Sequence, residues 1–190
     1  MLRQTILRAG CRLALCLILL PAAAPARADE RAAWTALEQG GHVALMRHAV
    51  TVPGVGDPPG FRLDDCATQR LLSETGRNWA RRFGAELRER GVTGARVLTS
   101  AWCRCVDTAE LMDLGPVEVF EPLNSFFGTR GDGAEQTAAV RDLMAAWQGP
   151  GTLVLVTHQV NVTALTGIYP ASGEVVVLRP GGAVVGRIRP

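Results

Sequence analysis

The segment "HVALMR" (residues 42–47) is an apolar run that ends in a charged side chain, and His48 follows it directly. A continuous apolar run without alternation is typical of a strand buried on both faces, as in a parallel sheet. Charged side chains are rarely fully buried unless they are paired, because an unpaired buried charge is costly. Arg47 and His48 therefore predict that something negatively charged binds where this strand ends.

The rest of the chain alternates between apolar strands and amphipathic helices. This alternation predicts a three-layer α/β/α sandwich with a mainly parallel sheet. Two β-rich segments separated by Pro-Gly-Gly predict a C-terminal hairpin. Further strands are expected at 96–100, 117–120, 152–158, 174–179 and 183–188, and helices at 73–90, 104–112, 135–147 and 160–167.

Residues 1–28 have the pattern of an export signal. A basic start precedes the apolar run "LALCLILL", which is too short to span a bilayer, and Ala26-Arg27-Ala28 resembles a signal peptidase site. Four of the 20 basic residues and none of the 18 acidic residues lie here, so residues 29–190 carry 16 basic and 18 acidic residues. We expect one exported domain, periplasmic or secreted, with no membrane anchor after cleavage and no basic surface for nucleic acid.

Three of the five cysteines remain after this cleavage: Cys66, Cys103 and Cys105. An exported protein is in a compartment that permits disulfides. Zinc is the alternative, but the spacing of "CRC" does not match the usual paired-cysteine ligands. We therefore expect Cys66 to pair with either Cys103 or Cys105.

Four cationic or imidazole side chains are expected at one edge of the sheet. Arg47, His48 and His158 follow the ends of predicted strands, and Arg104 begins a helix shortly after another. In open α/β sheets ligands bind at the carboxyl ends of the strands. No Asp or Glu neighbours these residues at the strand ends. A phosphoryl group fits such a pocket, because guanidinium groups offer paired donors to its oxygens.

Four motifs resemble the histidine phosphatase superfamily, which has the phosphoglycerate-mutase-like fold. They occur in the family's order and are "LMRHAVT", "LSETGRNWARRFG", "TSAWCRCVDTAEL" and "LVTHQVNVTALTG". The resemblance implies that His48 is the nucleophile and forms a phosphohistidine. It also implies that Arg47, Arg104 and His158 hold the phosphate, that Thr51 adds a hydroxyl, and that no metal or other cofactor is needed.

The chain departs from the family where a proton donor is expected. Relatives place Glu after Leu-Asn or Asp after the second His, whereas this chain has Ser125 and Gln159 there. Glu135 and Asp132 lie close enough in sequence to substitute, and Asp57 lies in the Pro/Gly-rich loop after His48. The sequence leaves the acid undetermined.

The expected function is that of an exported phosphatase for a phosphomonoester, either a small molecule or a component of the cell envelope. A phosphatase for phosphohistidine in proteins is one alternative, since a good leaving group needs no acid. A phosphate-binding module without catalysis is the other.

Overall fold

The computed structural model describes residues 25–128 and 132–190, with side chains described from residue 29. The predicted signal segment 1–28 falls largely outside the described residues and stays a prediction. None of the described helices is both long and apolar enough to cross a bilayer.

A six-stranded sheet with the order β3-β2-β4-β1-β5-β6 forms the middle layer. The neighbours β1–β4, β2–β4 and β2–β3 pair in parallel, and β5 is antiparallel to both β1 and β6. The mainly parallel sheet and the C-terminal hairpin are therefore confirmed. The strands are β1 (Val43–Arg47), β2 (Arg96–Thr99), β3 (Val117–Val119), β4 (Leu153–Thr157), β5 (Val175–Leu178) and β6 (Val184–Ile188).

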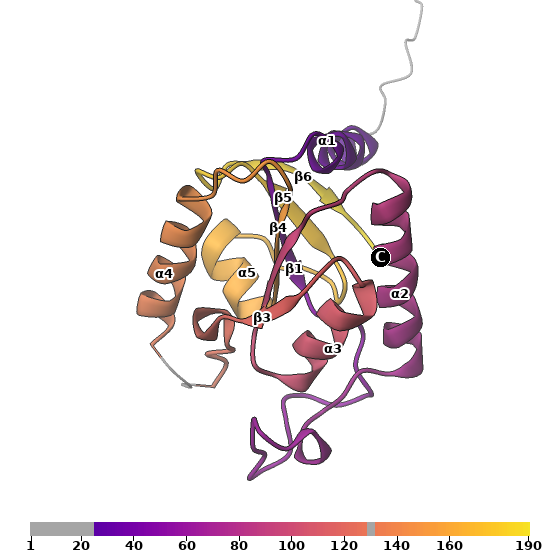
Figure 1. The fold of residues 1–190 in the computed structure, drawn as a ribbon. Helices are drawn as coiled ribbons and strands as arrows, with labels where there is room; N and C mark the ends of the chain where they lie inside the picture. Colours follow the sequence, from indigo (N-terminus) through magenta and orange to yellow (C-terminus); the bar gives the residue numbers. More distant parts are fainter. Residues whose placement is uncertain (1–24, 129–131) are drawn as a thin grey trace, which may run out of the picture.

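Helices cover both faces of the sheet, as Figure 1 shows, with α2 and α3 on one side and α4 and α5 on the other. Alternate residues of β1 pack into two separate cores: Ala44 and Met46 into one, Val43 and Leu45 into the other. The three-layer sandwich is therefore confirmed. The helices are α1 (Pro25–Gln39), α2 (Glu74–Glu89), α3 (Cys103–Met112), α4 (Gly133–Ala145) and α5 (Gln159–Thr166), and the short 3-10 helices are η1 (Cys66–Thr68) and η2 (Glu121–Leu123).

The start of α2 is fixed against the chain that follows His48. Ser73 caps the helix by accepting from Gly76 N–H, and Ser73 Oγ also donates to Val50 O at 3.1 Å. A Cβ atom at Gly76 would lie 2.0 Å from Val50 O, so only glycine permits this close approach. The Leu-Ser-x-x-Gly segment therefore positions the loop that leaves the end of β1.

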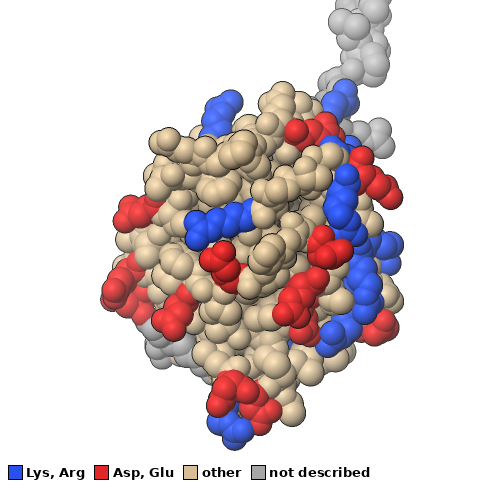
Figure 2. Space-filling model, viewed as in Figure 1, with Lys and Arg blue, Asp and Glu red and all other residues tan. Residues whose placement is uncertain are grey.

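The charged surface agrees with the near balance of acidic and basic residues. Figure 2 shows both kinds of side chain interspersed on the face in view. Several are paired, such as Arg90 with Glu86 and Glu38.

Candidate active site

The adjacent strands β1 and β4 bring the two histidines together. Arg47 is aligned with Thr157 in the parallel register, so His48 and His158 leave neighbouring strands at the same level. Their ring centroids lie 5.5 Å apart at a steep angle. This edge of the sheet is where an open α/β fold binds its ligand.

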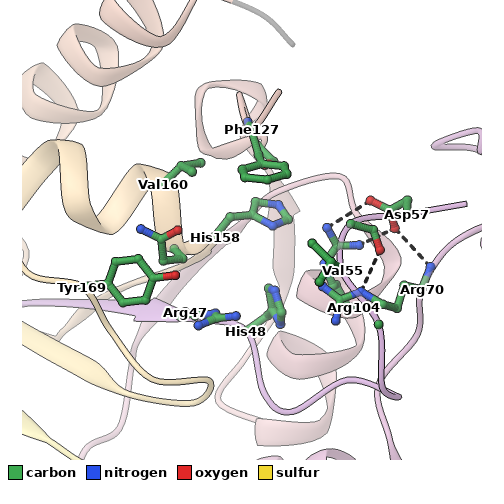
Figure 3. A pocket seen from close by; sticks show the side chains of 14 residues that line it. Arg47, His48, Val55, Asp57, Arg70, Arg104, Phe127, His158, Val160 and Tyr169 are labelled. Carbon is green, nitrogen blue, oxygen red and sulfur yellow. Dashed lines mark hydrogen bonds and ion pairs between the residues drawn. The ribbon is translucent and has the colours of Figure 1, made fainter. Parts of the chain in front are cut away.

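A cavity of about 260 Å³ lies at this edge. The four predicted residues, Arg47, His48, Arg104 and His158, all line it, although they come from three separate parts of the chain. Figure 3 shows the two imidazole rings between Arg47 on one side and Arg104 on the other. The structure therefore brings together the set that the sequence predicted to converge.

His48 is held as a neutral imidazole with one nitrogen committed. Its Nδ1 lies 2.8 Å from the carbonyl oxygen of Ala49, which can only accept, so Nδ1 carries the proton. Burial and the nearby Arg104 guanidinium lower the pKa of His48 to about 3. Nε2 consequently has a free lone pair at neutral pH, as a nucleophile requires.

Thr108 positions the carbonyl that binds His48, a role that the sequence did not suggest. Its hydroxyl donates to Arg104 O at 2.6 Å and accepts from Ala49 N–H at 3.1 Å. The first turn of α3 is thereby connected to the residue after the nucleophile. Its place in the Arg-x-x-x-Thr segment is the signal that could have identified it.

His158 is buried except where it lines the cavity, and its Nε2 lies 2.8 Å from Ser100 Oγ and 3.5 Å from Cys105 Sγ. Burial, followed by the neighbouring His48 and Arg104, lowers the pKa of His158 well below its usual value. His158 is therefore also neutral at pH 7, so it would interact with a ligand through its dipole and not through a charge.

The two neutral histidines predict loss of stability in acid. Because their pKa values are lowered in the folded protein, the unfolded chain binds more protons below pH 6.5, and stability falls as the pH falls. Each histidine contributes up to about 1.4 kcal/mol per pH unit in this window. Denaturant unfolding at pH 7 and pH 5 measures this decrease in the free energy of unfolding. In His48→Asn the decrease should be about half as large as in the wild-type protein. Equal losses in the two proteins would contradict the assignment of His48.

Arg47 contacts the opposite wall of the pocket. One Nη donates to Pro170 O at 3.1 Å, and Tyr169, also in the lining, lies beside it in Figure 3. The Nε atoms of Arg47 and Arg104 are buried and have no hydrogen-bond partner within the described residues. Buried donors without acceptors are costly, which is consistent with guanidiniums arranged for an anion.

A carboxylate enters the pocket, although no Asp or Glu neighbours the four site residues in sequence at the strand ends. Asp57, from the loop after His48, accepts from Arg104 Nη1 at 2.7 Å and Nη2 at 3.2 Å. Both side chains are almost fully buried, at 2% and 5% exposed. The sequence neighbours of the strand ends could not reveal Asp57, because it arrives on an irregular loop.

Arg70 is a third guanidinium in the lining and was also missed. Its Nε donates to Gly56 O at 2.8 Å, and one Nη donates to the Thr51 hydroxyl. Burial and the repulsion of Arg104 lower the pKa of Arg70. Thr51 supports Arg70 in this way and is not itself among the residues that line the cavity.

The two acids expected to replace the missing proton donor do not line the cavity that holds His48. Asp132 and Glu135 line a second hollow, which adjoins the first at Ser125. Asp132 caps α4 by accepting from Ala134 N–H and Glu135 N–H. Ser125 and Gln159 do line the first cavity, but neither side chain has a proton that titrates near neutral pH.

Cys66 pairs with Cys103, the first residue of α3, which decides between the two alternatives. The bond ties the loop that carries Asp57 to the residue beside Arg104. Cys105 is a buried free thiol, and burial raises its pKa to about 12.

Removing this bond should destabilise the fold. In the chain-entropy model, a disulfide across a separation of 37 residues contributes about 4 kcal/mol. We expect the free energy of unfolding of Cys66→Ser/Cys103→Ser, measured in guanidinium, to fall by about this amount. Cys105→Ser keeps the bond and serves as the control. Unchanged turnover in the double variant would mean that the bond stabilises the fold and has no role in catalysis. An unchanged unfolding midpoint would contradict the prediction.

Solved histidine phosphatases have a similar fold. SixA of Agrobacterium tumefaciens, assigned as a phosphohistidine phosphatase, is 18% identical, with a TM-score of 0.56 covering 80% of this chain and 99% of its own. A protein histidine phosphatase SixA solved with tungstate is 20% identical, with a TM-score of 0.55 and coverages of 78% and 96%. The mycobacterial glucosyl-3-phosphoglycerate phosphatase solved with VO3 is 19% identical, with a TM-score of 0.52 and coverages of 72% and 92%.

No protein-family model and no curated protein sequence matches the chain, so the likeness rests on three-dimensional structure. It extends over nearly the whole length of each of these solved chains. The chain therefore has the phosphoglycerate-mutase-like fold of the histidine phosphatase superfamily.

Proposed function

We propose that the protein is an exported phosphatase that hydrolyses a phosphomonoester through a phosphohistidine on His48. Arg47, Arg104 and His158 hold the phosphate, and Arg70 adds a further positive charge. The observation that carries the proposal is the state of His48: its Nδ1 is bound by a carbonyl, its pKa is lowered to about 3, and it shares a pocket with three guanidiniums.

The charge of the pocket supports a doubly negative ligand. With both histidines neutral, three guanidiniums and the Asp57 carboxylate leave a net charge of +2 among the described lining residues. A phosphomonoester carries close to two negative charges at pH 7. The ligand therefore neutralises the site, which accounts for the cations at the end of a buried strand.

The reaction follows from the two roles of these side chains. His48 Nε2 attacks phosphorus as the bond to the leaving oxygen breaks, which gives a phosphohistidine. The guanidiniums stabilise the charge on the equatorial oxygens in the transition state. Water then attacks the phosphohistidine and releases phosphate, and His48 returns to its neutral form.

The names of the compared proteins give independent support. One is described as a phosphohistidine phosphatase, one as a protein histidine phosphatase and one as a glucosyl-3-phosphoglycerate phosphatase. Two were solved with tetrahedral or related oxyanions, tungstate and VO3. A phosphoryl group is the shared chemistry of these proteins, whereas their leaving groups differ.

Export is proposed from two features of different kinds. Residues 1–28 have the composition of a cleaved signal, and the disulfide between Cys66 and Cys103 is of a kind found in oxidising compartments. Measuring the N-terminal residue of the protein isolated from its natural host tests the proposal, with Asp29 expected.

The purified protein should hydrolyse 4-nitrophenyl phosphate, whose leaving group needs little protonation. Turnover without added metal supports the phosphatase. Binding of inorganic phosphate without turnover would instead support the binding module, and a strong preference for a phosphohistidine peptide would support the protein phosphatase.

A further inference from the structure

One carboxyl group lines the cavity among the described residues, and it belongs to Asp57. We propose that Asp57 donates the proton to the leaving oxygen in the phosphatase reaction and accepts a proton from water in the second step. The proposal rests on the function proposed above and supplies the acid that the sequence left undetermined.

Asp57 is bound to the same guanidinium that is proposed to hold the phosphate. Arg104 donates to both of its carboxylate oxygens, at 2.7 and 3.2 Å. Figure 3 shows this carboxylate in the pocket between Arg104 and Arg70. We expect a phosphate held by the same guanidinium to lie beside Asp57, with an oxygen on phosphorus within its reach.

In the free protein Asp57 is an anion held by four donors. Besides the two from Arg104, Arg70 N–H donates at 3.1 Å and Trp102 Nε1 at 3.0 Å. Burial alone would raise the pKa of Asp57, but these hydrogen bonds and the charge of Arg104 lower it. The carboxylate therefore occupies part of the anion site until the substrate arrives.

Binding of a phosphate dianion reverses this balance. The phosphate competes for the donors of Arg104, and its two negative charges repel the carboxylate. Both effects favour the protonated form of a neighbouring carboxyl group and so raise its pKa. When the substrate binds, Asp57 therefore takes up a proton from solvent, at the stage when a donor is needed.

Two glycines precede Asp57 in the loop. Gly54 and Gly56 have φ values of +135° and +68°, conformations that glycine adopts readily. The far end of the loop is fixed to α3 by the Cys66–Cys103 bond. The acid role requires the Asp57 carboxyl group to turn from Arg104 towards the leaving oxygen when the substrate binds.

The proton balance closes over the two steps. In the first, the bond from phosphorus to the leaving oxygen breaks, the Nε2–P bond forms, and the Asp57 proton passes to the leaving oxygen. In the second, water attacks phosphorus, one of its protons passes to Asp57, and the Nε2–P bond breaks. When phosphate leaves, Asp57 releases this proton to solvent and returns to Arg104.

Asp57→Asn tests the proposal with two substrates of similar shape, phenyl phosphate and 4-nitrophenyl phosphate. Phenol is the weaker acid, so its departure depends more on protonation. We expect kcat/KM of the variant to fall about 100-fold or more for phenyl phosphate and less than about tenfold for 4-nitrophenyl phosphate. Glu135→Gln, a carboxyl group outside the cavity, should leave both values unchanged.

Two results would overturn the acid role of Asp57. Equal losses of kcat/KM for both substrates mean that Asp57 only positions Arg104, and an equal gain means that Asp57 only competes with the substrate.

If the variant does not fold, substituted phenyl phosphates decide the question in the wild-type protein. A working acid gives a kcat/KM that hardly depends on the acidity of the phenol, and a steep dependence refutes it. If the wild-type protein hydrolyses none of these esters, the proposed phosphatase fails as a whole and the acid role with it.

Discussion

His48→Ala should reduce turnover of 4-nitrophenyl phosphate by about 1000-fold or more, because the residue that attacks phosphorus is removed. The guanidiniums of Arg47, Arg70 and Arg104 remain, so the affinity for inorganic phosphate should change by no more than a few-fold, since they supply most of the charge. Steady-state kinetics and phosphate inhibition on the same preparation measure the two effects. A variant that keeps wild-type turnover would remove His48 from the mechanism.

The covalent intermediate gives this prediction a second measurement. Brief incubation of the wild-type protein with a ³²P-labelled substrate, followed by denaturation in alkali, should leave label on the chain. A phosphohistidine survives alkali and is lost in acid, unlike a phosphoserine. His48→Ala should retain no label, and label on that variant would place the nucleophile elsewhere.

Arg104→Ala should strongly destabilise the protein, because it leaves the Asp57 carboxylate buried without its guanidinium. Breaking a buried ion pair by removing one partner costs about 3–5 kcal/mol. The pKa of Asp57 is lowered in the wild-type protein, so its ionised form stabilises the fold above the ordinary value of 3.8. The destabilisation should therefore be greatest at neutral pH and become smaller in acid, where the variant can protonate Asp57.

The double variant Arg104→Ala/Asp57→Ala distinguishes the effect of an unpaired buried charge from the effect of lost side-chain volume. Removing both partners leaves no unpaired charge, so the double variant should be less destabilised than Arg104→Ala alone in denaturant unfolding. A double variant as unstable as the sum of the two single variants would show that the two side chains are not energetically coupled. Turnover should be about 100-fold lower or worse in both variants that lack Arg104.

The order of the strands and helices could be predicted because their apolar patterns are regular. The strand predicted at 42–47 is β1, and the last two segments form β5 and β6. Helix α1 (Pro25–Gln39) was not predicted, although Ala33 and Leu37 have helical spacing and are buried. It was missed because its first residues overlap the segment interpreted as a signal.

The site could be predicted only where its residues follow regular elements. Arg47, His48 and His158 are placed by the parallel register of two strands, and Arg104 by the first turn of a helix. Asp57 and Arg70 lie in the Pro/Gly-rich loop and just after η1, where contacts distant in sequence determine the backbone. Sequence periodicity does not describe such contacts. Arg70 was therefore missed, and the ion pair of Asp57 with Arg104 was not predicted.

The choice between Cys103 and Cys105 also depended on three dimensions. The two residues are two positions apart on α3, and such positions point to nearly opposite sides of a helix. Only Cys103 faces the loop that carries Cys66, whereas Cys105 packs against His158. The start and rotation of a helix are not fixed closely enough by sequence patterns to make this distinction.

The hydrogen bond from the indole of Trp102 to Asp57 gives the pocket an optical signal of its own. Indole emission is sensitive to a charged acceptor at its N–H, and Trp102 contacts both Asp57 and His158, which line the pocket. Occupancy of the site could thus be followed by ultraviolet fluorescence in real time, without a chromogenic ester or an attached dye.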